Sequence, residues 1–202
     1  MSGQNESNLD PALYNGSIYN YGSANILGHP FLHSRDFSRG SVIIDGIHYK
    51  NLLLNYDIFN QKIVFQFEDD KSTGFISIPK EVISSFMIDN RNFTILHKSN
   101  WDHTIYEKID SKDLSLLIKW IKRVKVSVKD EIHDFEYTPA NRTMYLLDSG
   151  KMKKLRRKKD FIKSFDENKK SDIKKFMRKN RIRFRSANSE ELTRLLKYSN
   201  AL

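Results

Sequence analysis

SVIIDGIHYKNLLLNYDIFNQKIVFQF, residues 41–67, is the densest run of β-branched and aromatic residues in the chain, and polar pairs interrupt it twice. The first pair, Asp45-Gly46, is a strong hairpin signal because glycine tolerates the positive φ that tight turns require. The second pair, Asn60-Gln61, indicates another reversal. The stretch therefore predicts consecutive antiparallel strands, enough to nucleate a sheet with one buried face.

Short apolar runs separated by polar turns continue to about residue 155. The predicted features are a polar reversal at 69–71, a strand at 75–78, a hairpin around 89–92, a strand at 104–106 and a three-residue hairpin loop at 148–150. Residues 114–128 fit helical spacing in their first part and alternate like a strand in their second. We interpret most of them as strand because β-branched residues dominate the second half. The pattern is typical of an antiparallel meander, sandwich- or barrel-like.

The periodicity changes after residue 157. Phe161 and Phe165 open a series of apolar residues at helical spacing, which predicts three short helices. Asn188 and Glu191 have the spacing of a capping box at the start of the last helix. The fold class expected is α+β, with an N-terminal arm at 1–40, an antiparallel β domain at 41–156 and a basic helical module at 157–202. Asp10-Pro11 predicts a short helical turn within the arm.

Composition restricts the chemistry. The 202 residues are 39% hydrophobic and 12% aromatic, which is enough apolar material for a folded core. The absence of cysteine excludes disulfides, thiolate metal sites and a cysteine nucleophile. No apolar run reaches the roughly 18–20 residues of a membrane-spanning helix. Phosphate-loop, dinucleotide and zinc-protease motifs are also missing, so we expect a protein that is not an enzyme and holds no cofactor and no metal.

Several motifs resemble a group of uncharacterised secreted proteins of Bacteroidota. They are Gly40-Ser41-Val42 with Asp45-Gly46, the run Asn55–Asn60, Tyr145, the turn Asp148–Lys151, Phe161–Phe165, Lys174-Lys175-Phe176, Lys179-Asn180 and Phe184. The resemblance implies a signal peptide upstream of the mature start. We therefore expect a secreted, periplasmic or outer-membrane-associated protein whose signal peptide has been removed, with Met1-Ser2-Gly3 as an added leader. The resemblance brings no activity and no catalytic residue.

Positive charge is concentrated in one segment. Residues 151–185 hold 17 of the 35 Lys and Arg residues but 4 of the 25 Asp and Glu residues, a local net charge of +13. The rest of the chain carries −3 of the total of +10. Such a segment attracts polyanions, whether nucleic acid or phosphate-bearing lipid surfaces, although a lysine-rich helix face is often only solvated. Phe176 and Phe184 offer base stacking in principle, but their spacing fits better a stripe that docks the helices.

The candidate binding residues are all basic, and we expect them to point outward when the apolar stripe of the helices packs inward. They are Lys169, Lys170, Lys174, Lys175, Arg178, Lys179, Arg181, Arg183 and Arg185. The function expected is that of a non-enzymatic secreted or envelope-associated binding or accessory protein, whose partner is an anionic surface or an envelope protein complex.

Two alternatives stay open. The first is a nucleic-acid-binding module that uses residues 151–185. The second is an enzyme with an unrecognised site near His97 and His103, which bracket Trp101 and Asp102. His29 and His33 have the i, i+4 spacing of helical metal ligands, but Gly28 and Pro30 favour two histidines in a loop.

Overall fold

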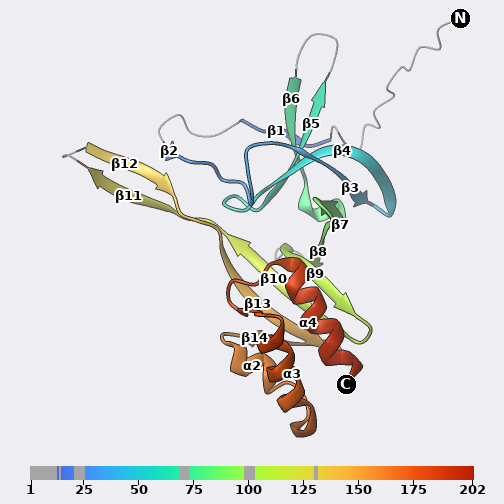
Figure 1. The fold of residues 1–202 in the computed structure, drawn as a ribbon. Helices are drawn as coiled ribbons and strands as arrows, with labels where there is room; N and C mark the ends of the chain where they lie inside the picture. The colour runs from blue at the N-terminus through green and yellow to red at the C-terminus, as the bar shows by residue number, and fades with distance from the viewer. Residues whose placement is uncertain (1–12, 14, 21–25, 69–72, 98–102, 130–131) are drawn as a thin grey trace, which may run out of the picture. The chain divides into compact units, whose positions relative to one another are not determined.

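The computed structural model describes residues 13, 15–20, 26–68, 73–97, 103–129 and 132–202 (Figure 1). Within them, a series of mostly antiparallel strands is followed by helices at the C-terminal end, which confirms the α+β class. The helical turn predicted at Asp10-Pro11, the reversal at 69–71, residues Trp101 and Asp102 and the side chain of His97 lie outside the described part.

Contacts divide the chain into two compact units. Unit 1 comprises Met1–Asn90, Ile95–His103 and Ile121–Ala140, and unit 2 comprises Arg91–Thr94, Thr104–Trp120 and Asn141–Leu202. This grouping differs from the three ranges expected from the pattern of turns and periodicity, because the C-terminal helices share a core with strands that lie much earlier in the chain.

Unit 1 is built on a sheet with the strand order β1-β6-β5-β4-β3-β7. Its elements are β1 (Ser17–Ile18), β3 (Ser38–Ile44), β4 (Ile47–Asp57), β5 (Lys62–Glu68), β6 (Thr73–Ile78), the 3-10 helix η1 (Lys80–Val82) and β7 (Ile83–Ile88). A second sheet has the order β11-β12-β2, from β11 (Val124–Lys129), β12 (Ile132–Tyr137) and β2 (Ile26–Leu27). Strand β2 pairs in parallel with β12, and sequence analysis predicted neither strand.

Residues 41–67 lie in β3, β4 and β5 and in the turns between them, as predicted. Ile44 pairs with Ile47, so Asp45 and Gly46 alone make the turn, with φ of 48° and 82°. Positive φ at both central residues defines a type I′ turn, whose twist matches that of the flanking strands. Gln61, with φ of 56°, lies in the second reversal, between β4 and β5. The hairpin prediction is therefore confirmed at both positions.

Unit 2 contains a sheet with the order β9-β10-β13-β14 and three helices. Its elements are β9 (His103–Ser111), β10 (Leu114–Ile121), β13 (Asn141–Asp148), β14 (Lys151–Leu155), α2 (Lys158–Ile162), α3 (Glu167–Lys179) and α4 (Ser189–Ala201); β8 (Arg91–His97) is shared between the units. The three-residue loop predicted at 148–150 is wrong by one residue. Asp148 pairs with Lys151, so the ladder closes on Ser149 and Gly150 alone. Gly150 has the left-handed conformation predicted for it, with φ of 78°.

The helices of unit 2 pack on its sheet around one apolar core (Figure 1). Leu116, Ile118 and Leu146 from the strands meet Ile173 and Leu192 from the helices, all at most 3% exposed. The predicted capping box is confirmed, because the Glu191 amide donates to the Asn188 side chain and the Asn188 amide donates to the Glu191 carboxylate. Unit 2 therefore buries the apolar stripes of its helices against its sheet.

Candidate anion-binding face

Helix α3 separates apolar and cationic residues onto different faces. Ile173 and Met177 are buried in the core. Lys170, Lys174 and Arg178 are four residues apart and so form a row along another face, since residues i and i+4 lie above one another on a helix. The helical period that places the apolar residues of α3 on one face therefore also places its basic residues together on another face.

The cationic row lines an open hollow of about 890 Å³, here called the basic hollow. Helix α3, the first residue of α2 and the segment after α3 supply its wall. The lining residues are Lys158, Glu167, Lys170, Ser171, Lys174, Lys175, Met177, Arg178, Arg181, Ile182 and Arg183. Seven of them are cationic and Glu167 alone is acidic, so the lining carries a formal net charge of +6.

The acidic residues of α3 neutralise two of these seven cations. Lys170 donates to Glu167 at 2.6 Å, and Lys175 donates to Asp172 at 3.1 Å. The hydrogen bond from Lys170 and its charge lower the pKa of Glu167, which is therefore ionised at neutral pH. The other five cations of the lining form no ion pair with any carboxylate in the described part of the chain. Their charge is available to a ligand.

Arg181 occupies an unusual position for its residue type. The Ile182 amide donates to the carbonyl of Met177 at 2.9 Å, and the Arg181 amide donates to that of Arg178 at 3.1 Å. These two bonds form a Schellman motif, in which the residue of left-handed conformation is usually glycine. Arg181 has that conformation, with φ of 53°, at a cost of about 1–2 kcal/mol relative to the ordinary helical region. The end of α3 would fold more readily with glycine there.

A second hollow, of about 610 Å³, involves the side of α3 that faces α4. Phe176 and Tyr198 stack in it, with ring centroids 4.0 Å apart and planes at 12°. Lys175, Arg178 and Lys179 surround the stacked pair, and the first two also line the basic hollow. Each ring uses one face on the other ring, so the stack fastens α3 to α4.

The structure brings most of the predicted binding residues together. Six line the basic hollow: Lys170, Lys174, Lys175, Arg178, Arg181 and Arg183. Lys179 lines the second hollow, and Lys169 and Arg185 line neither. Lys158 was missed, although it lies in the basic segment, because only the third dimension places the start of α2 beside α3.

Phe184 does not serve as a stacking platform. Its side chain is 3% exposed and lies in the core of unit 2, beside Phe161 at a centroid distance of 5.3 Å. The sequence interpretation of Phe184 as a docking residue is therefore confirmed. Phe176 is half-buried and is likewise used in packing.

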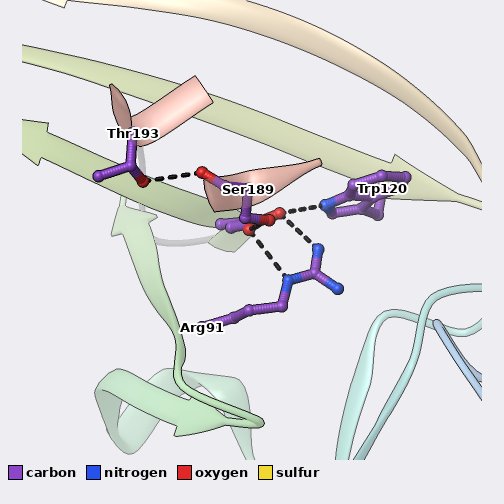
Figure 2. Close-up of polar contacts among 5 residues, drawn as sticks. Arg91, Trp120, Ser189 and Thr193 are labelled. Atoms are coloured by element: carbon purple, nitrogen blue, oxygen red, sulfur yellow. Dashed lines mark hydrogen bonds and ion pairs between the residues drawn. The ribbon is translucent and has the colours of Figure 1, made fainter. Parts of the chain in front are cut away.

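A buried carboxylate ties α4 to the sheet of unit 2, and no sequence motif announced it. Figure 2 shows Arg91 and Trp120 pointing toward it from two strands and Ser189 reaching it from the start of α4. The carboxylate belongs to Glu107, whose Oε1 accepts from Arg91 Nε at 3.0 Å and from the Ser189 hydroxyl. Its Oε2 accepts from Arg91 Nη2 at 2.5 Å and from Trp120 Nε1 at 2.7 Å.

The Glu107 cluster fixes the start of α4 against the sheet of unit 2. Burial raises the pKa of Glu107, but the hydrogen bonds and charge of Arg91, with those of Ser189 and Trp120, outweigh it and leave the pKa below its ordinary value. A carboxylate that accepts four hydrogen bonds is a poor proton acceptor, so the role of the cluster is structural and not catalytic. Arg142 stacks on Trp120 at 5.5 Å and donates to the carbonyl of Arg185 at 2.9 Å, which fixes the segment that carries Arg183.

The histidines of unit 1 do not form a metal site in the described residues. Lys122 Nζ donates to the carbonyl of His29 at 2.8 Å and lies 3.4 Å from its Nδ1. Burial, together with the charges of Lys122 and Arg35, lowers the pKa of His29. Across the described part of the chain, no three His, Asp or Glu side chains converge as metal ligands would.

Comparison with protein-family models, with curated proteins and with solved structures finds no match to this chain. No helix in the described ranges has both the length and the apolar character needed to cross a membrane.

Proposed function

We propose that the protein is a non-enzymatic binding protein that attaches to a phosphate-bearing anionic surface through the basic hollow of unit 2. The observation that carries the proposal is the sign of the charge in the lining. Seven cations and one carboxylate line one hollow, and five of these cations are in no ion pair with a described acidic residue.

Folding requires polar residues on this face but does not require that they share one sign. An amphipathic helix is satisfied by mixed charges, and α4 has them, with Glu190 and Glu191 in its first turn and Arg194 and Lys197 later. Placing Arg178 and Lys179 in the last turn of α3 is favourable because the C-terminal end of a helix dipole is negative. That effect leaves Lys158, the first half of the cationic row and the segment after α3 unexplained.

The location that we propose is the cell envelope or its exterior. Support comes from the resemblance of the turn and packing motifs to uncharacterised secreted proteins of Bacteroidota, and from the abundance of phosphate groups on lipid headgroups. An envelope protein complex is the other partner compatible with this location. The nucleic-acid alternative has less support, because Phe184 is buried and Phe176 is used in packing.

The experiment measures binding to vesicles of phosphatidylglycerol and phosphatidylcholine, and to vesicles of phosphatidylcholine alone. The wild-type protein should bind the first and not the second. Its attraction should weaken steeply as the screening length falls from about 10 Å at about 0.1 M salt to about 3 Å at about 1 M.

The decisive variant is Lys174→Glu/Arg178→Glu, with Arg194→Glu/Lys197→Glu on α4 as a control of identical net charge. Each cation near an anionic membrane contributes about 1 kcal/mol, so losing two should weaken binding by roughly 30-fold, before the repulsion of the new carboxylates is added. The control should bind nearly as well as the wild type. Equal losses in both variants, or binding that ignores salt, would reject the proposal. Tighter salt-dependent binding to single-stranded nucleic acid than to vesicles would favour the nucleic-acid alternative.

A further inference from the structure

We infer that the basic hollow is a discrete site for a phosphomonoester, the terminal phosphate of a lipid headgroup, and that Arg181 is its anchor. This inference rests on the proposed function and adds a ligand class to it. A cationic face without a discrete site would bind any anionic lipid with an affinity set by the charge density of the membrane. A discrete site distinguishes between headgroups of equal surface charge.

The first argument is the choice of residue at the end of α3. The Schellman motif there places residue 181 at φ of 53°, where glycine is the residue that folds most easily. The chain instead has arginine, whose side chain is exposed and lines the basic hollow. Other non-glycine residues, Lys112 among them, also have positive φ, so what distinguishes Arg181 is the coincidence of this unfavourable position with the lining of the basic hollow.

The second argument is the chemistry of the lining. Three of the lining residues are arginines, Arg178, Arg181 and Arg183. The planar guanidinium fork of an arginine can pair with two phosphate oxygens at once. Lys158 and Lys174 add point charges from two different helices. A phosphomonoester has about −1.5 to −2 charges near pH 7 and three acceptor oxygens, whereas a phosphodiester has a single charge and two free oxygens. The five cations of the lining that are in no described ion pair suit the more highly charged monoester better.

The third argument is size. A volume of about 890 Å³ is larger than a bare phosphate needs and lies in the range of small-molecule sites. Such a hollow takes the phosphate together with the polar group that carries it. The ligand class is therefore a phosphorylated headgroup.

The chain offers a matched pair of variants, Arg181→Gly and Lys112→Gly. Both replace an exposed cation of positive φ in unit 2 by glycine, because Lys112 has φ of 47° in the turn between β9 and β10. Each variant loses one charge and relieves one strained residue, so both should melt at or above the wild-type temperature. Only Arg181 lies in the basic hollow.

The test compares vesicles of phosphatidic acid, a monoester, with vesicles of phosphatidylglycerol, a diester, at equal zeta potential. The wild-type protein and Lys112→Gly should prefer phosphatidic acid, and Arg181→Gly should lose about tenfold or more of its affinity for it, as expected for a lost charged hydrogen-bonding group. Glycerol 3-phosphate should titrate the wild-type protein with saturation at one equivalent and displace it from the monoester vesicles. Arg183→Gln gives a second reading of the same site that leaves the helix end unchanged.

Each outcome decides a different statement. Equal affinity of the wild type for both vesicles, or equal losses in the two glycine variants, overturns the discrete site while the proposed attachment to an anionic surface stands. Failure of the wild type to bind either vesicle overturns both. Retention of the monoester preference in both Arg181→Gly and Arg183→Gln removes the anchor role from this hollow.

Discussion

Replacing Arg91 by methionine should destabilise unit 2 more than any exposed substitution. Methionine keeps most of the apolar stem but removes both bonds to Glu107, at 3.0 and 2.5 Å, and the cation–π contacts with Phe93 and Trp120 at 5.6 and 5.3 Å. Glu107 is 1% exposed, so its charge would be left buried without a cation. Removing one partner of a buried ion pair costs about 3–5 kcal/mol. The expected loss in the free energy of unfolding is of that size, out of about 5–15 kcal/mol for a typical domain.

The assay is urea unfolding followed by Trp120 fluorescence, in a Trp101→Phe background so that a single tryptophan reports on the cluster. Arg194→Met, an exposed arginine of α4, is the matched control and should change the free energy of unfolding by no more than about 0.5 kcal/mol.

The loss should also depend on pH in a defined direction. In the wild type, the pKa of Glu107 is lowered from 4.5, so its stabilising contribution is complete above that value and is lost as the pH falls through the folded-state pKa. In Arg91→Met, burial without a cation raises the pKa of Glu107, and acid then relieves the buried charge. The difference between the two proteins should therefore be largest near neutral pH and shrink as the pH falls below about 5. A difference within about 0.5 kcal/mol of zero, or one that is constant with pH, would refute the structural role of Glu107.

Three further predictions concern a turn, a strand and a helix cap. Gly46→Val should lower the free energy of unfolding by roughly 1–3 kcal/mol through backbone strain alone, since no atom lies within 4 Å of the added Cβ; Gly46→Asn, which tolerates positive φ, is the control, and equal melting temperatures would contradict the assignment of a type I′ turn. Gly40→Ala should destabilise unit 1 through a clash with the Met87 carbonyl, 2.2 Å from the added Cβ, and the register of β3 against β7 is wrong if this variant melts like the wild type. Asn188→Ala should cost about 1 kcal/mol in urea unfolding because α4 loses its N-cap, and Asn188→Asp should restore most of it.

Local chemistry in the sequence was sufficient for much of the fold. Asp45-Gly46 specified a hairpin because few residue pairs adopt two positive φ values cheaply. Asn188 and Glu191 specified a helix start because their side chains satisfy amides within the same turn. The buried stripe of Ile173 and Met177 followed from the 3.6-residue period, and the exposure of Lys174 and Arg178 followed with it.

Pairing between distant segments could not be read in the same way. Strand β2 is two residues long and pairs with β12 more than a hundred positions later, and neither segment carries a local turn signal that would link them. The Glu107 cluster joins Arg91, Trp120 and Ser189, whose spacing along the chain follows no period of a helix or strand. A buried carboxylate needs hydrogen-bond donors, and these can come from any part of the chain, so no local pattern reveals them.

The amino-acid sequence shows that the net positive charge of the protein is concentrated in residues 151–185, but it does not show which of those charges lie together in space. Lys158 is in the basic hollow because α2 packs beside α3, whereas Lys169 and Arg185, equally basic neighbours in sequence, are not. Arg181 became distinctive once its place in the Schellman motif and beside the basic hollow was known, since nothing in the letters Asn-Arg-Ile shows that an arginine occupies the place of a glycine. The net charge follows from composition, whereas a binding site depends on the distances between charged side chains, which are set by how the helices pack.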